Sequence, residues 1–583
     1  MKEVIVGIDL GTTNSEVAVV RDGRVEVIPV AGDVRILPSV VGIADDGALL
    51  VGEAAKNQYV LHPERTVRSI KRRMGEAARV AMGERDYMPQ EISAMILRRL
   101  KSLAEAHLGH EVAKAVITVP AFFSDAQRQA TREAGEIAGL EVARIINEPT
   151  AAALAYESRH KVARKALVYD LGGGTFDVSV VNLEGDVVEV LASHGNNHLG
   201  GDDFDRKVID FALDHLKQAH GVDASRFPAA MARLQRAAEA AKIALSDRPY
   251  ATLAEEYLLE HQGLPVHLSL EISRNDYEAL IEPYIDETLD AVHVALSGAR
   301  LTVSDIDEIL LVGGATRTPL VARRLEEELR LQPRGEVDPD LCVAMGAAIQ
   351  AALIAGAQTQ TVLVDVTPYT FGTGAVGELD GEPYPYCFVP LIRKNTPIPV
   401  SKSEVFYTMF DGQDKVDVTV YQGEDPDALN NIEIGRFMVE GLRDAPAGNP
   451  VVLSFALDLN GILQVTAREK QTGLECSITI DNAIARFEQD KLDEARSRVQ
   501  ALFGEEQRAG APEDEIDRDS RRLQVEARAL VEKAERLLEQ ARAEDAEDLV
   551  DAIESVKDAL GGEDAPLQGA MNNLADLLYY LES

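Results

Sequence analysis

VYDLGGGTFD, residues 168–177, is the stretch that decides the fold. It continues an apolar run from Ala166 that is typical of a buried strand. The three glycines allow a tight turn with bare backbone N–H groups, Thr175 adds a hydroxyl, and Asp170 and Asp177 add carboxylates. Amides, a hydroxyl and carboxylates together suit a phosphate chain with its Mg²⁺ ion. A glycine-rich hairpin without a ligand is the alternative that this stretch alone leaves open.

The beginning of the chain repeats this pattern. GIDLGTTN, residues 7–14, is again an apolar strand followed by Asp, Leu, Gly and hydroxyl residues. A duplicated half-domain is the simplest explanation, with Asp9 and Asp170 in equivalent places. Two such hairpins that face each other would hold the phosphates of a nucleotide from both sides, with both aspartates near the metal.

The composition limits the class of protein. With 583 residues the chain has room for roughly three to five domains, and 46% hydrophobic residues can build sizeable cores. A net charge of −39 argues against nucleic acid as a partner, because phosphate binding needs Lys and Arg. Three widely spaced cysteines indicate a reducing compartment without a disulfide framework. We expect neither a signal peptide nor a membrane-spanning run, and therefore predict a cytoplasmic protein.

Several candidate side chains also have a plain structural explanation. Lys71 lies in the basic run SIKRRMG, where local sequence favours an exposed helix face over a contact with the γ-phosphate. Glu148 begins an Ala-rich helix, where it either favours the helix N-terminus electrostatically or contacts a metal-bound or attacking water. The spacing of Glu239, Lys242 and Ser246 puts them on one helix face, which is either an exposed charged stripe or part of a site.

Two further glycine turns come before predicted helices. LGGDDFD, residues 199–205, offers helix N-terminal amides that could hold an anion. LVGGATRTP, residues 311–319, lets the backbone approach a ligand closely. Asp338-Pro339-Asp340 caps the last helix of this part, which we expect from Leu341 to about Ala355.

The periodicity of the chain changes twice after that helix. The apolar segment from Val362 to Pro368 is either a core strand or a linker that docks in one state and is released in another. From about 369 to 484 apolar residues alternate, and Asn460-Gly461 predicts a two-residue hairpin turn, as in an antiparallel β-sandwich. From about 485 onward, apolar residues spaced three and four apart predict a small helical bundle.

Taken together, these motifs resemble the DnaK-type, seventy-kilodalton heat-shock family. The resemblance covers nearly the whole chain and rests on GIDLGTTNS (7–15), AVITVPAFFSDAQRQAT (115–131), INEPTAAALAY (146–156), DLGGGTFDVSV (170–180), LGGDDFD (199–205) and LVGGATRTP (311–319). It implies a multidomain α/β + β + α fold and an ATP-dependent chaperone that folds proteins in the stress response. The implied parts are an actin-like (ribonuclease H-like), two-lobed ATPase domain at 1–357, an interdomain linker at 358–368, a β-sandwich substrate-binding domain at 369–484 and a helical lid at 485–583.

The resemblance implies roles for many residues of the first domain. Lys71 would orient the attacking water, helped by Glu148 and Thr175, and Asp9 and Asp170 would hold Mg²⁺ through water. The residues implied to bind ATP or ADP are Asp9, Gly11, Thr12, Thr13, Asn14, Gly172, Gly173, Gly174, Gly200, Gly201, Glu239, Lys242, Ser246, Gly313, Gly314, Arg317 and Asp340. K⁺ is expected as a further cofactor.

It also implies how the domains communicate and what they bind. Pro120 and Arg128 would report the nucleotide state to the linker. The linker residues implied in this coupling are Val362, Leu363, Val364 and Asp365. An extended apolar segment of an unfolded protein would bind at Val376, Phe406, Met409, Val416 and Val418, with Val376 and Met409 closing over it. The expected partners are a J-domain co-chaperone and a GrpE-type exchange factor, without nucleic acid or membrane.

Departures from the family pattern suggest a divergent bacterial paralogue of the HscC or HscA kind. Tyr369-Thr370-Phe371 is unusual, and Ile243 stands where some relatives have Arg. Two other functions are a small-molecule phosphotransferase on the same actin-like fold and a non-hydrolysing relative that acts as a nucleotide-exchange factor. The first does not need the second half of this chain, and Lys71, Asp170 and Thr175 argue against the second.

Overall fold

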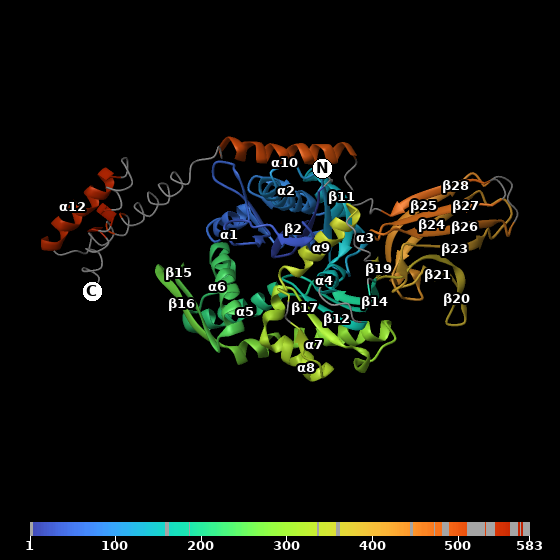
Figure 1. Cartoon of the computed structure of the whole chain (residues 1–583), viewed down its shortest axis with the longest axis horizontal. Helices are drawn as coiled ribbons and strands as arrows, with labels where there is room; N and C mark the ends of the chain where they lie inside the picture. The colour runs from blue at the N-terminus through green and yellow to red at the C-terminus, as the bar shows by residue number, and fades with distance from the viewer. Residues whose placement is uncertain are drawn as a thin grey trace. The chain divides into compact units, whose positions relative to one another are not determined.

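The computed structural model places most of the chain in defined elements (Figure 1). The described residues are 4–157, 163–185, 187–334, 337–356, 362–442, 447–470, 473–480, 489–509, 531, 534, 543–559, 569–571 and 573–574. They fall into two compact units, Met1–Leu502 and Phe503–Ser583. The predicted domain boundaries lie partly outside the described residues, at 358–361 and 485–488, and stay predictions.

A six-stranded sheet begins the chain. Its path is β11-β10-β1-β2-β3, and β4 pairs with β2. The strands are β1 (Ile5–Leu10), β2 (Asn14–Arg21), β3 (Arg24–Val27), β4 (Leu37–Pro38), β10 (Lys114–Val119) and β11 (Glu141–Asn147). The pairs are parallel from β11 to β1 and antiparallel from β1 to β3. Pro120 directly follows β10, as expected of a residue that cannot donate to a strand ladder.

A seven-stranded sheet repeats this arrangement. Its path is β18-β17-β12-β13-β14-β19-β22. The strands are β12 (Arg164–Leu171), β13 (Phe176–Glu184), β14 (Val187–Asn196), β17 (Glu308–Val312), β18 (Pro333–Arg334), β19 (Val362–Val366) and β22 (Pro397–Ile398). From β18 to β14 the pairs are parallel and then antiparallel, in the same order as from β11 to β3. This agrees with the predicted duplication, and β19 and β22 are additions to the second copy.

Helices α4 and α9 join the two sheets. The helices of this part are α1 (Glu53–Tyr59), α2 (Pro89–Leu108), α3 (Asp125–Ile137), α4 (Glu148–Glu157), α5 (Gly201–His220), α6 (Pro228–Asp247), α7 (Arg274–Gly298), α8 (Pro319–Leu329) and α9 (Cys342–Ile354). α9 packs on β1 and β2, and α4 packs on β12 and β13 as well as on α9. A Cβ atom at Gly346 of α9 would lie 1.7 Å from the carbonyl oxygen of Ala151 in α4, so only glycine permits this approach.

Smaller elements surround these sheets. The additional strands are β5 (Val40–Ile43), β6 (Leu49–Val51), β7 (Thr66–Arg68), β8 (Val80–Met82), β9 (Arg85–Tyr87), β15 (Tyr250–His261) and β16 (Leu264–Ser273). Short 3-10 helices occupy Pro63–Arg65, Ile70–Arg73, Ala224–Arg226, Val303–Asp305, Gly314–Arg317 and Ala428–Asn430.

Residues 371–480 contain two four-stranded sheets, which we call the two-sheet region. The paths are β21-β20-β24-β25 and β23-β26-β27-β28. The strands are β20 (Phe371–Leu379), β21 (Glu382–Ile392), β23 (Val400–Tyr407), β24 (Lys415–Gln422), β25 (Ile432–Glu440), β26 (Pro450–Leu457), β27 (Leu463–Glu469) and β28 (Glu475–Ile480). Buried residues of both sheets form one core, so the sheets pack face to face. The predicted two-residue turn at Asn460-Gly461 is wrong, because Leu457 pairs with Leu463 and residues 458–462 form the loop.

The end of the chain is helical where it is described. α10 (Gln489–Ala509) follows the two-sheet region, and α12 (Ala543–Ala559) lies in the second unit. A small apolar core of that unit contains Val531, Ala534, Leu549, Ile553, Val556, Met571 and Leu574. These elements agree with the helical character predicted from about 485 onward.

Candidate functional site

The two glycine hairpins meet at a cavity of about 640 Å³. They approach so closely that a Cβ atom on Gly173 would lie 1.9 Å from Thr13 Oγ1. All predicted nucleotide-binding and catalytic residues line the cavity except Gly174 and Gly200. Gly174 lies behind the wall, where a Cβ atom would be 2.4 Å from Thr12 Cγ2. The cavity volume is in the range of small-molecule binding sites.

The start of α5 supports the glycine turn of β12–β13. The N–H groups of Gly201 and Asp202 donate to the carbonyl oxygens of Gly172 and Gly173 at 3.0 and 2.7 Å. A Cβ atom on Gly200 would lie 2.6 Å from the carbonyl carbon of Gly173. These two amides of α5 therefore hold the turn, whereas the sequence had suggested that they hold an anion. Their contribution to a phosphate site is to fix the glycine loop.

Lys71 is buried beside the cavity, with 3% of its surface exposed. Its ammonium group forms an ion pair with Glu148 and lies 5.7 Å from the centre of the Phe123 ring. The exposed helix face favoured by local sequence is therefore wrong, because the 3-10 helix that follows the left-handed Ser69 (φ 54°) turns Lys71 inward. Burial lowers the pKa of Lys71, but the charges of Glu148 and Asp9 outweigh burial and raise the pKa above its ordinary value.

Buried carboxyl groups surround this lysine. Burial, and then the charge of Glu148, raises the pKa of Asp9 to about 7. The same two causes raise the pKa of Asp170 well above its ordinary value. Thr118 donates a hydrogen bond of 2.8 Å to Asp9. Because buried negative charge is costly without a compensating positive charge, this arrangement favours a bound cation.

Magnesium and a phosphate chain fit this set of donors and acceptors. Mg²⁺ is usually bound by one or two carboxylates, water and substrate phosphates, and Asp9 and Asp170 supply such carboxylates. The Thr13 hydroxyl oxygen lines the cavity and is buried without a hydrogen-bond partner, so a hydroxyl remains there for a ligand. Within the described ranges, no group of three His, Cys, Asp or Glu side chains is placed to hold a metal ion. Phosphate oxygens would therefore have to complete the coordination.

The opposite wall of the cavity is formed by α6 and by the turns after β17 and before α9. It is lined by Glu239, Lys242, Ile243, Ser246, Gly313, Gly314, Arg317 and Asp340. Glu239 forms an ion pair of 2.9 Å with Lys56, and Lys242 forms one of 2.7 Å with Asp205. The alternative prediction of an exposed charged stripe is therefore wrong, because Glu239 and Lys242 each have an ion-pair partner beside the cavity.

Almost the whole chain matches one protein family. The family described as "Hsp70 protein" matches residues 5–81 and 76–581. The chain belongs to the Hsp70 family. Chaperone protein DnaK of Thermotoga neapolitana is 49% identical over 497 residues, which cover 84% of this chain and 82% of that protein. Chaperone protein DnaK of Thermotoga petrophila is 50% identical over 487 residues, covering 82% and 80% of the two chains.

A third relative gives the same result. Chaperone protein DnaK of Thermosipho africanus is 49% identical over 496 residues, which cover 84% of this chain and 82% of that protein. The resemblance to the DnaK-type family is thus confirmed. The finer assignment to a paralogue of the HscC or HscA kind stays a prediction.

In this Hsp70 chain, the predicted linker contains a strand of the seven-stranded sheet. β19 pairs in parallel with β14 and antiparallel with β22, which belongs to the connection between β21 and β23. Leu363 packs against a core made by α4, α9 and the sheet, and Val366 is buried in it. Val362 is 52% exposed, and Val364 is half-buried. In this structure the segment is a strand of the sheet, and its release in another state stays a prediction.

A chain of hydrogen bonds connects this strand to α3. Asp365 is buried and accepts hydrogen bonds from Asn147 Nδ2 at 2.8 Å and Thr150 Oγ1 at 3.1 Å. Arg128 donates to Asn147 Oδ1 at 2.7 Å and to the carbonyl oxygen of Ala121 at 3.0 Å. The predicted residues Arg128 and Asp365 are thus connected through Asn147. Arg128 also binds Ala121, which directly follows the predicted residue Pro120.

Aromatic residues make a second contact, between the segment that leads into the two-sheet region and the connection from β10 to α3. The Tyr369 hydroxyl donates to the carbonyl oxygen of Phe122 at 2.5 Å, and the two rings lie 4.9 Å apart. The Phe122 ring also meets His194 at 5.2 Å. Lys394 lies 3.4 Å from His194 Nδ1. Burial, and then the Lys394 charge, lowers the pKa of His194 to about 4.

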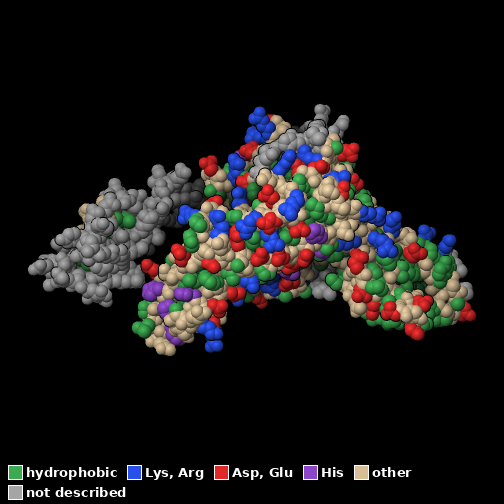
Figure 2. All heavy atoms as spheres, turned by 90° about the horizontal axis from the view of Figure 1, so that it is seen from below, with side chains coloured by type: hydrophobic (Ala, Val, Ile, Leu, Met, Phe, Trp, Pro, Cys, Tyr) green, Lys and Arg blue, Asp and Glu red, His purple; other side chains and the backbone are tan. Residues whose placement is uncertain are grey.

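The predicted peptide-binding residues differ in exposure. Val376 and Met409 are exposed, Phe406 and Val416 are partly buried against the core, and Val418 is buried in it. Further exposed apolar residues of this region are Tyr386, Val405, Tyr407 and Phe410. Figure 2 shows hydrophobic side chains gathered on the two-sheet region, with acidic side chains around them. The predicted closing residues are thus available to a partner, whereas Val418 supports the core.

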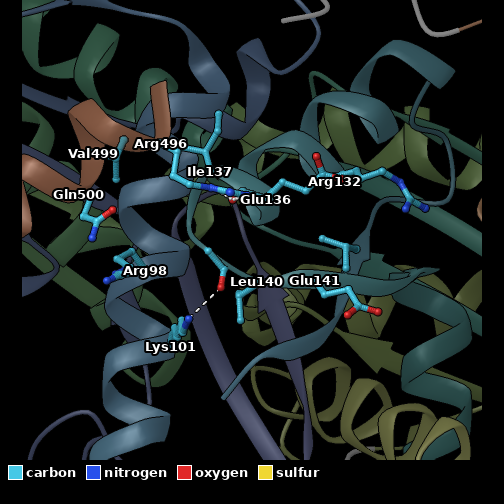
Figure 3. Close-up of a pocket in the computed structure, with 12 residues that line it drawn as sticks. Arg98, Lys101, Arg132, Glu136, Ile137, Leu140, Glu141, Arg496, Val499 and Gln500 are labelled. Carbon is cyan, nitrogen blue, oxygen red and sulfur yellow. Dashed lines mark hydrogen bonds between the residues drawn. The ribbon is translucent and has the colours of Figure 1, made fainter. Parts of the chain in front are cut away.

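A second cavity of about 600 Å³ lies where α10 meets α2 and α3. Figure 3 shows Arg98 and Lys101 of α2 and Arg496 of α10 around the end of α3, and each of them donates to a carbonyl oxygen there. The bonds join Arg98 to Ala138 at 3.2 Å, Lys101 to Gly139 at 2.8 Å and Arg496 to Glu136 at 2.8 Å. Arg498 of α10 also forms an ion pair of 2.7 Å with Glu91. These cations stabilise the C-terminus of α3 and fasten α10 to it.

Sequence reasoning missed several residues of these sites. Glu16 lines the nucleotide cavity, and the signal was its place two residues after Asn14 in a strand, which puts both on one face. Asn460 accepts a hydrogen bond of 3.1 Å from the N–H group of Ile145, and Tyr369 binds Phe122. No local pattern could have found these last two contacts. Over the ranges that the structure describes, no helix combines the length and apolar character needed to cross a membrane.

Proposed function

We propose that this Hsp70 chain is an ATP-dependent chaperone, an ATPase that binds and releases extended apolar segments of unfolded proteins. The observation that supports the proposal most strongly is that two consecutive residues contact the two different sites. Asn147 binds Asp365 of the linker strand, while Glu148 binds Lys71 beside the nucleotide cavity. A change at the phosphates that moves Glu148 therefore acts on the linker through a single peptide unit. This is a physical route for coupling two sites.

The residues of the cavity have separate tasks in hydrolysis. Thr12, Thr13 and the Gly172–Gly174 turn orient the phosphates of ATP, and Asp9 and Asp170 hold Mg²⁺ through water. The metal ion neutralises phosphate charge when bound, and K⁺ accompanies it. Lys71 orients the attacking water, and Glu148 and Thr175 fix the lysine and that water. The adenosine lies along the wall of α6 and Arg317.

The parts of the chain work as a two-state device. The ATPase domain, residues 1–357, is an actin-like pair of lobes, the linker is 358–368, the β-sandwich is 369–484 and the helical lid is 485–583. ATP closes the lobes and docks the linker through Val362, Leu363 and Val364, while the lid opens. Hydrolysis releases the linker and shuts the lid over the bound segment. The pairing of β19 with β14 supports the docked half of this cycle.

The two-sheet region supplies the peptide site. An apolar side chain of the client packs on Phe406 and Val416, the buried Val418 supports this site from the core, and Val376 and Met409 close over it. Burying a Leu-sized side chain stabilises such a complex by about 1.5–3 kcal/mol, which suits reversible capture. A J-domain protein stimulates hydrolysis and a GrpE-type factor exchanges the nucleotide. The protein works in the cytoplasm.

The decisive experiment measures phosphate release from ATP with and without an unfolded polypeptide. Reduced, carboxymethylated α-lactalbumin is the probe, and we expect it to accelerate release several-fold. Phosphate transfer to a sugar or acetate, without acceleration by the polypeptide, would instead identify a small-molecule phosphotransferase. Nucleotide binding without any hydrolysis would identify a non-hydrolysing exchange-factor relative. Either result overturns the proposal.

A further inference from the structure

The cavity between α2, α3 and α10 has no part in the proposed function. The charged side chains of its lining are the basic Arg98, Lys101, Arg132 and Arg496 and the acidic Glu136 and Glu141. Glu141 is exposed and forms an ion pair of 3.1 Å with Lys114, which does not line the cavity. A chain with a net charge of −39 therefore gathers an excess of positive charge at this cavity.

Three of the basic groups lie around the end of α3. A Cβ atom on Gly139 would lie 3.0 Å from Arg98 Nη1 and 3.6 Å from Lys101 Nζ, so these two groups of α2 are neighbours. Arg496 reaches the same helix end from α10, whereas Arg132 extends away from the other three (Figure 3). Lys101 is only 7% exposed, but Arg496 is exposed, so solvent reaches the group.

The end of α3 does not neutralise these cations. The charged side chains of the lining carry a net charge of +2, and their outside partners Lys114 and Glu105 leave this sum unchanged. A helix C-terminus is equivalent to about −0.5 elementary charge. A positive excess of about 1.5 charges therefore remains at the cavity.

Hydrogen-bond donors also remain there. Arg98 uses one N–H group for the carbonyl oxygen of Ala138, and Arg496 uses two for that of Glu136. A guanidinium group has five N–H donors, so both side chains keep further donors. In the described part of the chain neither arginine forms an ion pair. An anion would thus find both charge and donors in this cavity.

We propose that this cavity binds a small anion with more than one phosphate group, held by Arg98 and Lys101 on one side and by Arg496 on the other. The planar fork of a guanidinium group matches two oxygens of a phosphate. The volume of about 600 Å³ is in the range of small-molecule sites. Basic groups on two separate helices suit a ligand whose negative charges are spread over several phosphate groups.

The ligand would join two parts of the chain that are distant in sequence. Arg98 and Lys101 belong to α2, and Arg496 belongs to α10, about 400 residues later. An anion bound to all three stabilises the contact of α10 with α2 and α3, in addition to the ion pair of Arg498 with Glu91. The cavity is thus a regulatory site at which a phosphate compound favours the attached position of α10.

Sodium tripolyphosphate is the probe, and calorimetry measures its binding to the full chain, freed of nucleotide and kept in EDTA. Arg98→Gln and Arg496→Gln should each weaken binding at least about tenfold, because each removes a charged donor. Orthophosphate should bind the unmodified chain more weakly than tripolyphosphate. Equal affinity in the unmodified chain and both variants overturns the proposal, since it would place the probe elsewhere. Equal affinity for orthophosphate overturns the requirement for several phosphates.

Arg99 provides the matched control. It follows Arg98 on α2 and is also partly buried, but it does not line the cavity. Arg99→Gln should bind tripolyphosphate as the unmodified chain does, and a loss equal to that of Arg98→Gln would show an effect of total charge alone, against the proposal. If Arg98→Gln does not fold, the exposed Arg496 decides.

Amide hydrogen exchange tests the connection to α10. Tripolyphosphate should slow exchange in residues 491–502 of the unmodified chain and leave it unchanged in Arg496→Gln. Binding without slower exchange would overturn the regulatory part of the proposal. Neither measurement contains ATP or an unfolded polypeptide, so a negative result leaves the proposed chaperone function standing. A failure of polypeptide-stimulated phosphate release would likewise leave this anion site standing.

Discussion

The nucleotide cavity and the exposed apolar residues of the two-sheet region are built in opposite ways. Backbone segments pack closely against each other around the cavity, as at Gly200 and Gly173. Buried ion pairs such as that of Lys71 with Glu148 also stabilise it. The two-sheet region presents exposed side chains such as Val376 and Met409 on a separate apolar core. A substitution in the cavity therefore changes the geometry of a whole site, whereas one in the apolar set changes a single contact. Catalysis needs the first kind of construction, and binding of many clients needs the second.

The largest effect should come from Lys71→Ala. The change removes the positive group beside the phosphates, so we expect ATP hydrolysis to fall about 100- to 1,000-fold. Single-turnover hydrolysis measures this. ATP should still bind, and peptide affinity without nucleotide should not change, because the two regions have separate cores. Arg73→Ala is the control, since Arg73 pairs with Glu76 outside the cavity. Normal turnover in Lys71→Ala would remove the role assigned to this lysine.

The second effect concerns the strand between the two regions. Leu363→Asp puts a charge where β19 packs on the core, so docking should weaken at least about tenfold. The ratio of ATP turnover with and without unfolded polypeptide should fall to about one, while each region keeps its own binding.

The neighbouring residue gives a matched control for this change. Val362 is more than half exposed on the same strand, so Val362→Asp should weaken docking less than Leu363→Asp and keep more of the stimulation. Equal losses in the two variants would show that β19 does not couple through burial of Leu363.

The sequence could predict the cavity because its requirements are local. Glycines, hydroxyl residues and aspartates at the ends of two strands specify the facing hairpins without reference to the rest of the chain. The local sequence around Lys71 favours an exposed position, because its burial depends on Glu148 and Phe123, which are distant in sequence, and only the family resemblance assigns it to the site. The sequence does not single out Glu16, because one acidic residue in a strand normally faces water. The contact of Asn460 with Ile145 depends on how two regions distant in sequence pack together, and neither segment contains a signal for it.

A smaller effect is expected from Met409→Ala in the apolar set. Met409 is 64% exposed, and burying part of such a side chain under a client contributes about 1 kcal/mol, or about fivefold in affinity. Fluorescence anisotropy of a labelled apolar peptide measures this, and basal ATP turnover should not change. Tyr257→Ala, at an exposed apolar residue of β15, should leave peptide affinity unchanged. Loss of hydrolysis in Met409→Ala would contradict the separation of the two regions.

The smallest effect is a pH dependence of domain docking. His194 is half-buried next to Phe122 and Lys394, where its pKa is about 4 in place of 6.5. Separation of the domains would return the pKa toward 6.5, so the separated form binds more protons below that pH. Docking is then fully stable above about pH 6.5 and weakens as pH falls toward 4. We expect stimulation by polypeptide to drop about two- to threefold between pH 7.5 and 5.5, beyond the drop in His194→Asn. Identical pH profiles would contradict this role of His194.

The parallel pairing of β19 with β14 has a consequence for how finely the chain can be controlled. Side chains alternate between the two faces of a strand, so a slip by one residue would turn Leu363 out of its core and Asp365 away from Asn147. The strand therefore has no intermediate register in which it is partly engaged. Any graded response of the protein must come from the fraction of molecules with the strand in place, as with a switch that is averaged over many copies.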